Sequence, residues 1–143
     1  MYSILLSLII LNLTLSKLLF NRHVFYKPAR ISHFYLSNNS IVPEGAIAIA
    51  EALKVNSSVS HIHVSYNSIG NEGAIAIAEA LKVNSSVSTI YLYNNSIGNE
   101  GAIAIAEALK VNSSVSKIIL DINSINSQTQ QSLKSLHKNR IRF

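Results

Sequence analysis

The chain has 143 residues, of which 48% are hydrophobic and 13% charged, so it is long enough for one domain with a buried core and too apolar for a disordered tail. It contains no cysteine, which excludes disulfides, thiolate metal sites and cysteine nucleophiles. The formal net charge is +5, yet residues 31–126 carry four lysines against six glutamates and Asp121, a net charge of −3. The basic excess therefore lies in the two flanks and predicts solvated ends rather than a nucleic-acid-binding face.

Residues 1–20, MYSILLSLIILNLTLSKLLF, form an apolar segment, and a basic linker follows it up to residue 30. The run from Ile4 to Leu11 is apolar enough for a secretory signal or a membrane anchor, although no lysine or arginine precedes it. A cap over the first repeat unit and a gene-boundary artefact are the other interpretations. Any membrane contact is expected through residues 1–20 only.

A repeat of 28 residues organises the rest of the chain. The block GAIAIAEALKVNSSVS occurs three times, beginning at Gly45, Gly73 and Gly101. A shorter element of the form LxxLxLxxNxI precedes each block and recurs a fourth time after the last one. The chain therefore divides into four units, the last of which ends in a C-terminal cap: residues 31–58, 59–86, 87–114 and 115–143.

Each unit is predicted to contain one strand and one helix. Alternation at Ile62 and Val64 has a period of two, which suits a short strand with one buried face. In the block that follows, apolar residues recur at i, i+3, i+4 and i+7, as in an amphipathic helix. In the second unit these residues are Ala74, Ile77, Ala78 and Leu81. Isoleucines at the flank of this stripe are expected to pack between neighbouring helices: Ile47, Ile75 and Ile103.

Capping residues predict where the helices begin. Asn71 is predicted to cap the helix of its own unit, since asparagine is favoured at that position. The fourth unit lacks the alanine-rich helix, but Ser127 and Gln130 form a capping-box pattern. This pattern predicts a helix from about Gln128 to His137, whose polarity suits a terminal cap with one side in water.

One unit cannot bury its apolar face alone, so the units must stack, with their strands paired in a parallel sheet and their helices on the other side. The LxxLxLxxNxI motif, the EGA-type helix start and the 28-residue period resemble the ribonuclease-inhibitor class of leucine-rich repeats, which also supplies the repeats of nucleotide-binding immune receptors. The resemblance covers roughly residues 31–138. It implies an α/β solenoid, a short right-handed horseshoe with a concave parallel sheet and convex helices. It also implies an inward ladder of asparagines that satisfy backbone groups: Asn39, Asn67, Asn95 and Asn123.

The two central units differ only in and beside the predicted strand. Residues 67–88 and 95–116 are identical, and all five differences fall at positions 61–66 against 89–94. A constant frame with varied strand residues favours recognition at the sheet, while recent duplication with accidental substitutions stays as the alternative. Tyrosine offers a large contact area at low entropic cost, so we expect a protein or peptide ligand on the concave face. The residues predicted for this face are His33, Tyr35, His61, His63, Ser65, Tyr91, Tyr93, Lys117 and Asp121.

The histidines also allow a metal hypothesis. His33 and His61 occupy the same place in adjacent strands, and His63 lies two residues along on the same face, which could suit zinc or another transition metal. No carboxylate is placed beside them, so an ordinary polar surface is favoured. We therefore expect neither a metal nor a cofactor.

The sequence favours a scaffold or binding module over an enzyme, because it has no serine–histidine–acid cluster, no phosphate-binding glycine loop and no metal-ligand spacing. Ran GTPase-activating proteins use similar repeats, so regulation of a small GTPase is one alternative, although their longer array and acidic tail are missing. A repeat fragment of an innate-immune-type receptor is another. The lack of cysteine caps favours the cytoplasm, with membrane anchoring or secretion through residues 1–20 as the alternative. In a secreted chain the Asn-x-Ser sequons would matter as glycosylation acceptors: Asn56, Asn84 and Asn112.

Overall fold

The computed structural model describes residues 31–143, apart from the side chain of Lys138, and shows strands and helices in regular alternation. The interpretations of residues 1–30 as cap, signal, anchor or linker lie outside the described residues. In chain order the elements are β1 (His33–Tyr35), α2 (Pro43–Val55), β2 (His61–His63), α3 (Gly70–Val83), β3 (Thr89–Tyr91), α4 (Asn99–Val111), β4 (Lys117–Ile119), α5 (Ser127–His137), the 3-10 helix η2 (Lys138–Arg140) and β5 (Ile141–Arg142).

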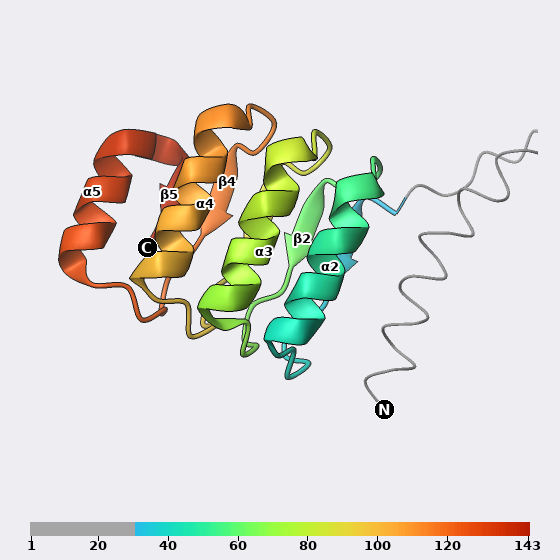
Figure 1. The fold of residues 1–143 in the computed structure, drawn as a ribbon, viewed down its shortest axis with the longest axis horizontal. Coiled ribbons are helices and arrows are strands. Elements are labelled where there is room, and N and C mark those ends of the chain that lie inside the picture. The colour runs from blue at the N-terminus through green and yellow to red at the C-terminus, as the bar shows by residue number, and fades with distance from the viewer. Residues whose placement is uncertain (1–30) are drawn as a thin grey trace, which may run out of the picture.

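The strands form one parallel sheet in the order β1-β2-β3-β4-β5, with the helices side by side along it (Figure 1). From β1 to β4 each residue pairs with the one 28 positions along, as in His33 with His61 and His61 with Thr89. Paired strands lie about 4.8 Å apart, whereas packed helices need about 8–10 Å, so the array curves with the sheet on its inner, concave side. The predicted α/β solenoid is confirmed.

A fifth strand was not predicted. β5 adds Ile141 beside Ile118 of β4, and Ile141 is buried while Arg142 is exposed. The alternation of apolar and polar residues in the last four positions carries this signal, but two paired residues are too few to recognise without the rest of the sheet.

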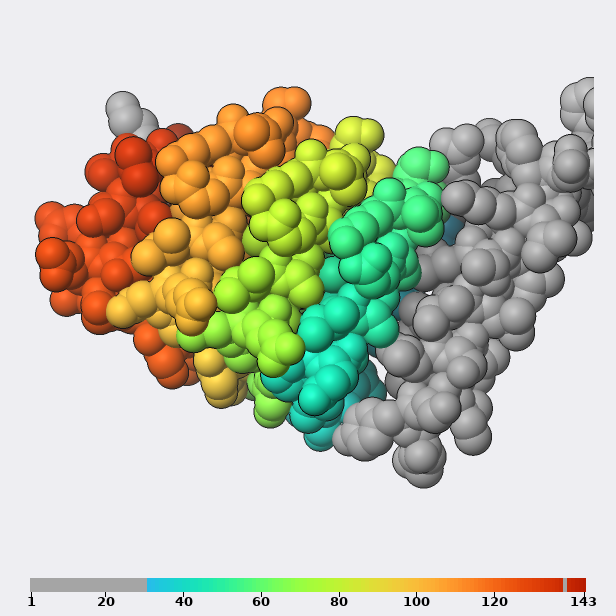
Figure 2. Space-filling model, viewed as in Figure 1, coloured from blue at the N-terminus to red at the C-terminus, as the bar shows by residue number. Residues whose placement is uncertain are grey.

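The core is a continuous aliphatic layer between the sheet and the helices. In the two central units the inward positions of the LxxLxL element are buried, at Ile62, Val64, Ile90 and Leu92. In the first unit Phe34 is half-buried. Alanine and glycine let adjacent helices approach closely, and Figure 2 shows the outer surface that these helices form together. A Cβ atom at Gly101 would lie only 2.9 Å from Cβ of Ala74 in the preceding helix. Packing between units therefore depends on the small residues of the repeated block.

The expected packing of the flanking isoleucines holds for two units only. Ile47 and Ile75 are half-buried, but Ile103 is 46% exposed because the shorter, polar α5 covers less of α4 than α4 covers of α3. Within residues 31–143, no helix is both long enough and apolar enough to cross a membrane.

The helix caps differ from the sequence-based expectation, because asparagines cap the helix of the next unit. The predicted cap of α3 by Asn71 is wrong, since α3 begins at Gly70 without a side-chain cap. Instead, Asn71 Oδ1 accepts hydrogen bonds from the backbone N–H groups of Gly98 at 2.7 Å and Gly101 at 3.1 Å, at the start of α4. Each such bond ties one unit to its neighbour.

The last helix begins at Ser127, one residue before the predicted start, and Asn126 rather than Ser127 caps it. Asn126 Oδ1 accepts the backbone N–H of Thr129 at 2.8 Å, while the side chain of Gln130 donates to the carbonyl of Ile125. The sequence-based prediction differs by one residue because asparagine and serine are both common N-cap residues and stand next to each other here.

Candidate functional site

The nine residues predicted for the concave face lie in three rows that cross the strands. The first row is His33, His61, Thr89 and Lys117, and the second is Tyr35, His63, Tyr91 and Ile119. The third follows the strand ends, where backbone hydrogen bonds connect adjacent units, and contains Ser65, Tyr93 and Asp121. Most of these side chains are exposed or half-buried, while Thr89 and Ile119 are nearly covered. We call this surface the sheet face.

Aromatic and imidazole rings stack on one another at the β1 end of the sheet face. The ring centroids of His33 and His61 lie 4.3 Å apart, those of Tyr35 and His63 4.5 Å, and those of His63 and Tyr91 4.3 Å. The planes of these pairs differ by 10° to 23°. The stacking follows from the register, because equivalent positions in neighbouring strands lie about 4.8 Å apart. We call these five residues the ring ladder.

Serine hydroxyls orient two of the imidazoles. Ser32 Oγ lies 3.0 Å from Nδ1 of His33, and Ser60 Oγ lies 2.9 Å from Nδ1 of His61. Since Nδ1 is engaged near the backbone, Nε2 lies on the distal edge of each ring. Stacking covers the ring faces, so the ring ladder offers its polar edges to a ligand.

Burial lowers the pKa of His63, and the charges of His33 and His61 lower it further. Among residues 31–143, no three histidine, aspartate or glutamate side chains gather as a metal site would require. His33 and His61 stack in parallel instead of converging on one point.

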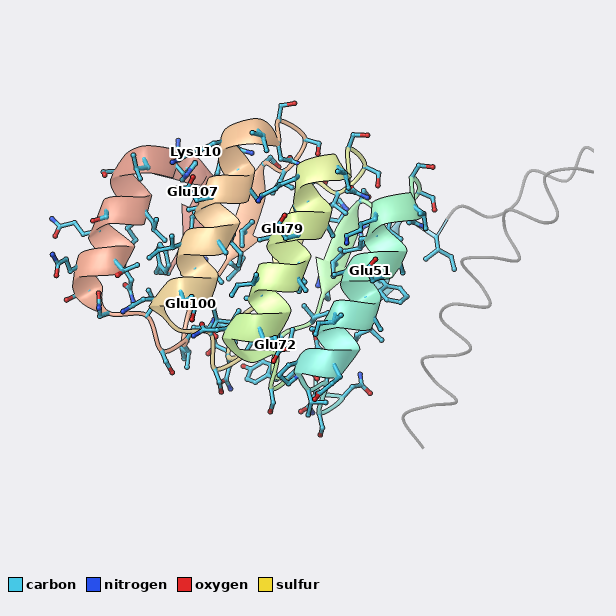
Figure 3. The ribbon with its side chains drawn as sticks, viewed as in Figure 1. Glu51, Glu72, Glu79, Glu100, Glu107 and Lys110 are labelled. Atoms are coloured by element: carbon cyan, nitrogen blue, oxygen red, sulfur yellow. The ribbon has the colours of Figure 1, made fainter. Side chains whose placement is uncertain are left out.

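The charges of the two sides of the solenoid differ in sign. Arg142 of β5 pairs with Ile119 and extends the second row of the sheet face. The sheet face so extended carries Lys117 and Arg142 against the single carboxylate of Asp121, and Arg142 Nε lies 3.4 Å from Asp121 Oδ2. The helices α2 to α4 carry six glutamates and three lysines, and Figure 3 shows glutamates along their outer side. Three of these glutamates pair with a lysine one turn later at 2.6 Å, as in Glu79 with Lys82. The helical side is therefore net acidic and the sheet face net basic.

Two residues at the rim of the sheet face have a strained backbone. Tyr66 and Ile122 occupy equivalent positions, with φ of 56° and 52°, and their exposed fractions are 53% and 66%. Asn38 and Asn94 stand at the same position in the other units, with φ of 62° and 51°. Asparagine tolerates this left-handed region, whereas tyrosine and a β-branched residue are destabilised there.

These rim residues were not predicted, although the asparagine at position 94, equivalent to Tyr66, is a signal for a left-handed backbone. The ring of Tyr66 lies 5.0 Å from that of Tyr93, and a hydrogen bond with Tyr66 raises the pKa of Tyr93. Strained backbone positions cluster at functional sites, so these exposed rim residues are candidates for the same interaction surface as the sheet face.

The first set of asparagines joins the strand ends of successive units. Asn67 Oδ1 accepts the backbone N–H groups of Asn39 and Ile41, and its Nδ2 donates to the carbonyl of Leu36. Asn123 repeats these bonds toward the third unit. Asn95 Nδ2 donates to Val64, but its Oδ1 is buried without a partner in the described structure. Asn39 is exposed, and its Nδ2 donates to the carbonyl of Ser37 in its own turn.

The sequon asparagines form a second set at the other end of the strands. Asn84 Nδ2 donates to the carbonyls of Leu53 and Asn56 in the preceding unit, and its Oδ1 accepts the N–H of Val87. Asn112 makes the same bonds one unit later. Sequence analysis considered these residues only as glycosylation acceptors and missed this structural role.

Arg140 binds the backbone carbonyls at the C-terminal end of the second set of asparagines. Its Nη1 donates to the carbonyl of Leu109 at 2.8 Å, its Nη2 to Asn112 at 2.6 Å and its Nε to Val115 at 2.9 Å. The first two carbonyls are the ones that an asparagine of a further unit would bind. For Arg140, the predicted solvated basic end is therefore wrong, because this side chain replaces the next repeat.

Comparisons with known proteins agree with this architecture. A family model described as Leucine Rich repeat matches residues 55–78 and 83–106. Among solved structures, the leiomodin-1 actin-binding site 2 is similar, with a TM-score of 0.69 and 22% sequence identity over 78% of this chain and 70% of that chain. No curated protein matches the sequence. The fold is that of a leucine-rich-repeat protein.

Proposed function

We propose that this leucine-rich-repeat solenoid is a non-catalytic interaction module that binds a protein or peptide on the sheet face. The observation that carries the proposal is the distribution of differences between two otherwise identical units. Four of the five differing pairs lie on the sheet face or its rim, and only Val64 with Leu92 is inside the core. Substitutions have thus changed the exposed surface while the frame stayed constant, as expected for a recognition surface on a repeat scaffold.

The chemistry of the sheet face supports this proposal. The ring ladder supplies rigid amphipathic side chains, already stacked before a ligand arrives, so that binding costs little side-chain entropy. The strained tyrosine at the rim adds exposed aromatic area. The 28-residue strand–helix unit also supports placement in the ribonuclease-inhibitor-like class.

The second set of asparagines supports a cytoplasmic location. Asn84 and Asn112 are only 5% and 6% exposed, and their amide groups donate to buried carbonyls. A glycan on either amide nitrogen would replace one of its two N–H donors and would not fit at this buried position, so glycosylation of these sequons would oppose folding of the array.

The test compares proteins captured from cell extract by the full chain and by a variant of its sheet face. The variant carries Tyr35→Ala, His63→Ala, Tyr91→Ala and Tyr93→Ala, and circular dichroism verifies that it folds. A matched control on the opposite side carries Glu51→Gln, Glu79→Gln and Glu107→Gln. We expect partners that the native chain and the control retain and that the quadruple variant loses.

Binding is then measured with the purified partner by calorimetry. Actin is a first candidate to test by co-sedimentation, because the similar leiomodin domain is named for actin binding. Equal capture of every partner by the native chain and the quadruple variant would refute binding at the sheet face.

A further inference from the structure

We propose that the ligand of the sheet face is an acidic segment of a partner protein and that its binding is coupled to proton uptake by His33, His61 and His63. This inference rests on the proposed function and specifies its ligand. It follows from the charges of the two sides of the solenoid, the spacing of the basic groups and the arrangement of the imidazoles.

Charge complementarity identifies the occupant. At neutral pH, Lys117 and Arg142 outnumber Asp121, the one carboxylate among the described residues of the sheet face, and Asp121 already pairs with Arg142. The three imidazoles raise the charge of the same surface from +1 to +4 when they are protonated. The helices α2 to α4 on the other side carry a net charge of −3, so an acidic segment is attracted to the sheet face and repelled from these helices.

The spacing suits an extended peptide that crosses the strands. His33 and Lys117 are three strands apart in one row, a distance of about 14 Å at 4.8 Å per strand. An extended peptide covers this distance with about four to five residues at 3.3 Å each. In such a peptide, carboxylates at alternate positions would point toward the sheet. There they would meet the edges of the His33 and His61 rings and the ammonium group of Lys117, which lie in a single row.

The imidazoles lack a carboxylate of their own. His33 and His61 stack at 4.3 Å, and the rings of His33 and His63 lie 6.4 Å apart. Tyr35 of β1 and Tyr91 of β3 cover the two faces of His63, and the hydroxyls of Ser32 and Ser60 bind Nδ1 of their neighbours. Thr89 of β3 and Lys117 of β4 complete the first row. Every described group that faces the imidazoles is thus neutral or basic.

This environment opposes protonation in the free protein. Burial and the charges of His33 and His61 both lower the pKa of His63. A bound carboxylate favours the charged imidazole and raises its pKa, so binding takes up protons and the affinity must increase as the pH falls through about 6.5. The stacked histidines therefore make the affinity for a negatively charged ligand depend on the pH.

The test uses a tetramethylrhodamine-labelled peptide of eight aspartates, with peptides of eight serines and eight lysines as controls, and measures fluorescence anisotropy with the full chain. Aspartate has a pKa of about 3.9, so the probe keeps its charge between about pH 7.5 and 5.5. One exposed ion pair strengthens binding by about 1.5- to 5-fold, so three predict an affinity about tenfold higher at the lower pH. A variant with all three histidines replaced by glutamine should lose this increase, whereas the matched control His137→Gln should keep it.

Chemical-shift titration of the histidine ring protons in the native chain gives a second measurement that needs no variant. The pKa of His63, which burial lowers in the free protein, should rise when the aspartate peptide is added. The inference is overturned if the aspartate peptide fails to bind at both pH values, if its affinity is the same at both, or if the lysine peptide binds better. The proposed function is tested separately, since it fails only if the quadruple alanine variant retains every partner.

Discussion

Replacing Arg140 by methionine should destabilise the array by removing the group that terminates its hydrogen bonds. The guanidinium donates to the carbonyls of Leu109, Asn112 and Val115 from a half-buried position. At about 1 kcal/mol for each lost bond, the free energy of unfolding should fall by about 3 kcal/mol. Methionine keeps most of the aliphatic contact, so the loss reports on the hydrogen bonds rather than on packing.

Urea denaturation followed by circular dichroism measures this loss. Arg142→Met is the matched control, since that side chain is 68% exposed and its ion pair with Asp121 should contribute less than about 1 kcal/mol. Arg140→Lys restores a single ammonium group in place of a planar fork with three engaged nitrogens, and it should recover only about a third of the loss. Equal stability of the two methionine variants would refute the assignment of Arg140 as the terminating group.

Three further predictions concern the rim, the helix packing and the histidines. Tyr66→Asn should stabilise the fold by about 0.5 to 1 kcal/mol in thermal unfolding, because the relief of left-handed backbone strain outweighs the loss of the exposed ring contact with Tyr93. A lower melting temperature of the variant would contradict this. Gly101→Ala should cost about 1 to 3 kcal/mol in urea denaturation, because its Cβ would meet that of Ala74 at 2.9 Å, and an unchanged midpoint would show that the helices can separate freely. Burial lowers the pKa of both His63 and His137, so below about pH 6.5 the unfolded chain binds protons that the folded chain resists, and the free energy of unfolding should decrease as the pH falls from about 6.5. Urea denaturation at about pH 7.5 and 5.5 measures this change, and equal stability at both values would refute it.

The fold was predictable because the 28-residue period fixes the register of every unit. Ile62 and Val64 lie in the core as the alternation indicates, and the strands pair with their equivalents. The identity of the sheet-face residues followed from the same alternation, since His61 and His63 must point away from Ile62. Their stacking was not predicted, because it depends on the side-chain conformations that neighbouring strands allow.

Features that join one unit to the next were much harder to predict. Asn71 has the sequence signature of an N-cap for its own helix, but its Oδ1 accepts the backbone N–H of Gly98 at the start of the next helix, 27 positions later. Arg140 carries no local signal, since its role depends on carbonyls 25 to 31 positions earlier. Tyrosine at position 66 does not by itself indicate a left-handed backbone, and only the asparagine at the equivalent position 94 suggests the positive φ.

The direction of the bonds between units has a consequence for how the protein is made. Asn84 and Asn112 each donate hydrogen bonds to backbone carbonyls of the preceding unit. Arg140 does the same for the carbonyls of the third unit. During translation every unit emerges from the ribosome with open backbone groups that only later residues can satisfy. A unit therefore completes its hydrogen bonds only after the following unit, or Arg140 in the last case, has left the exit tunnel.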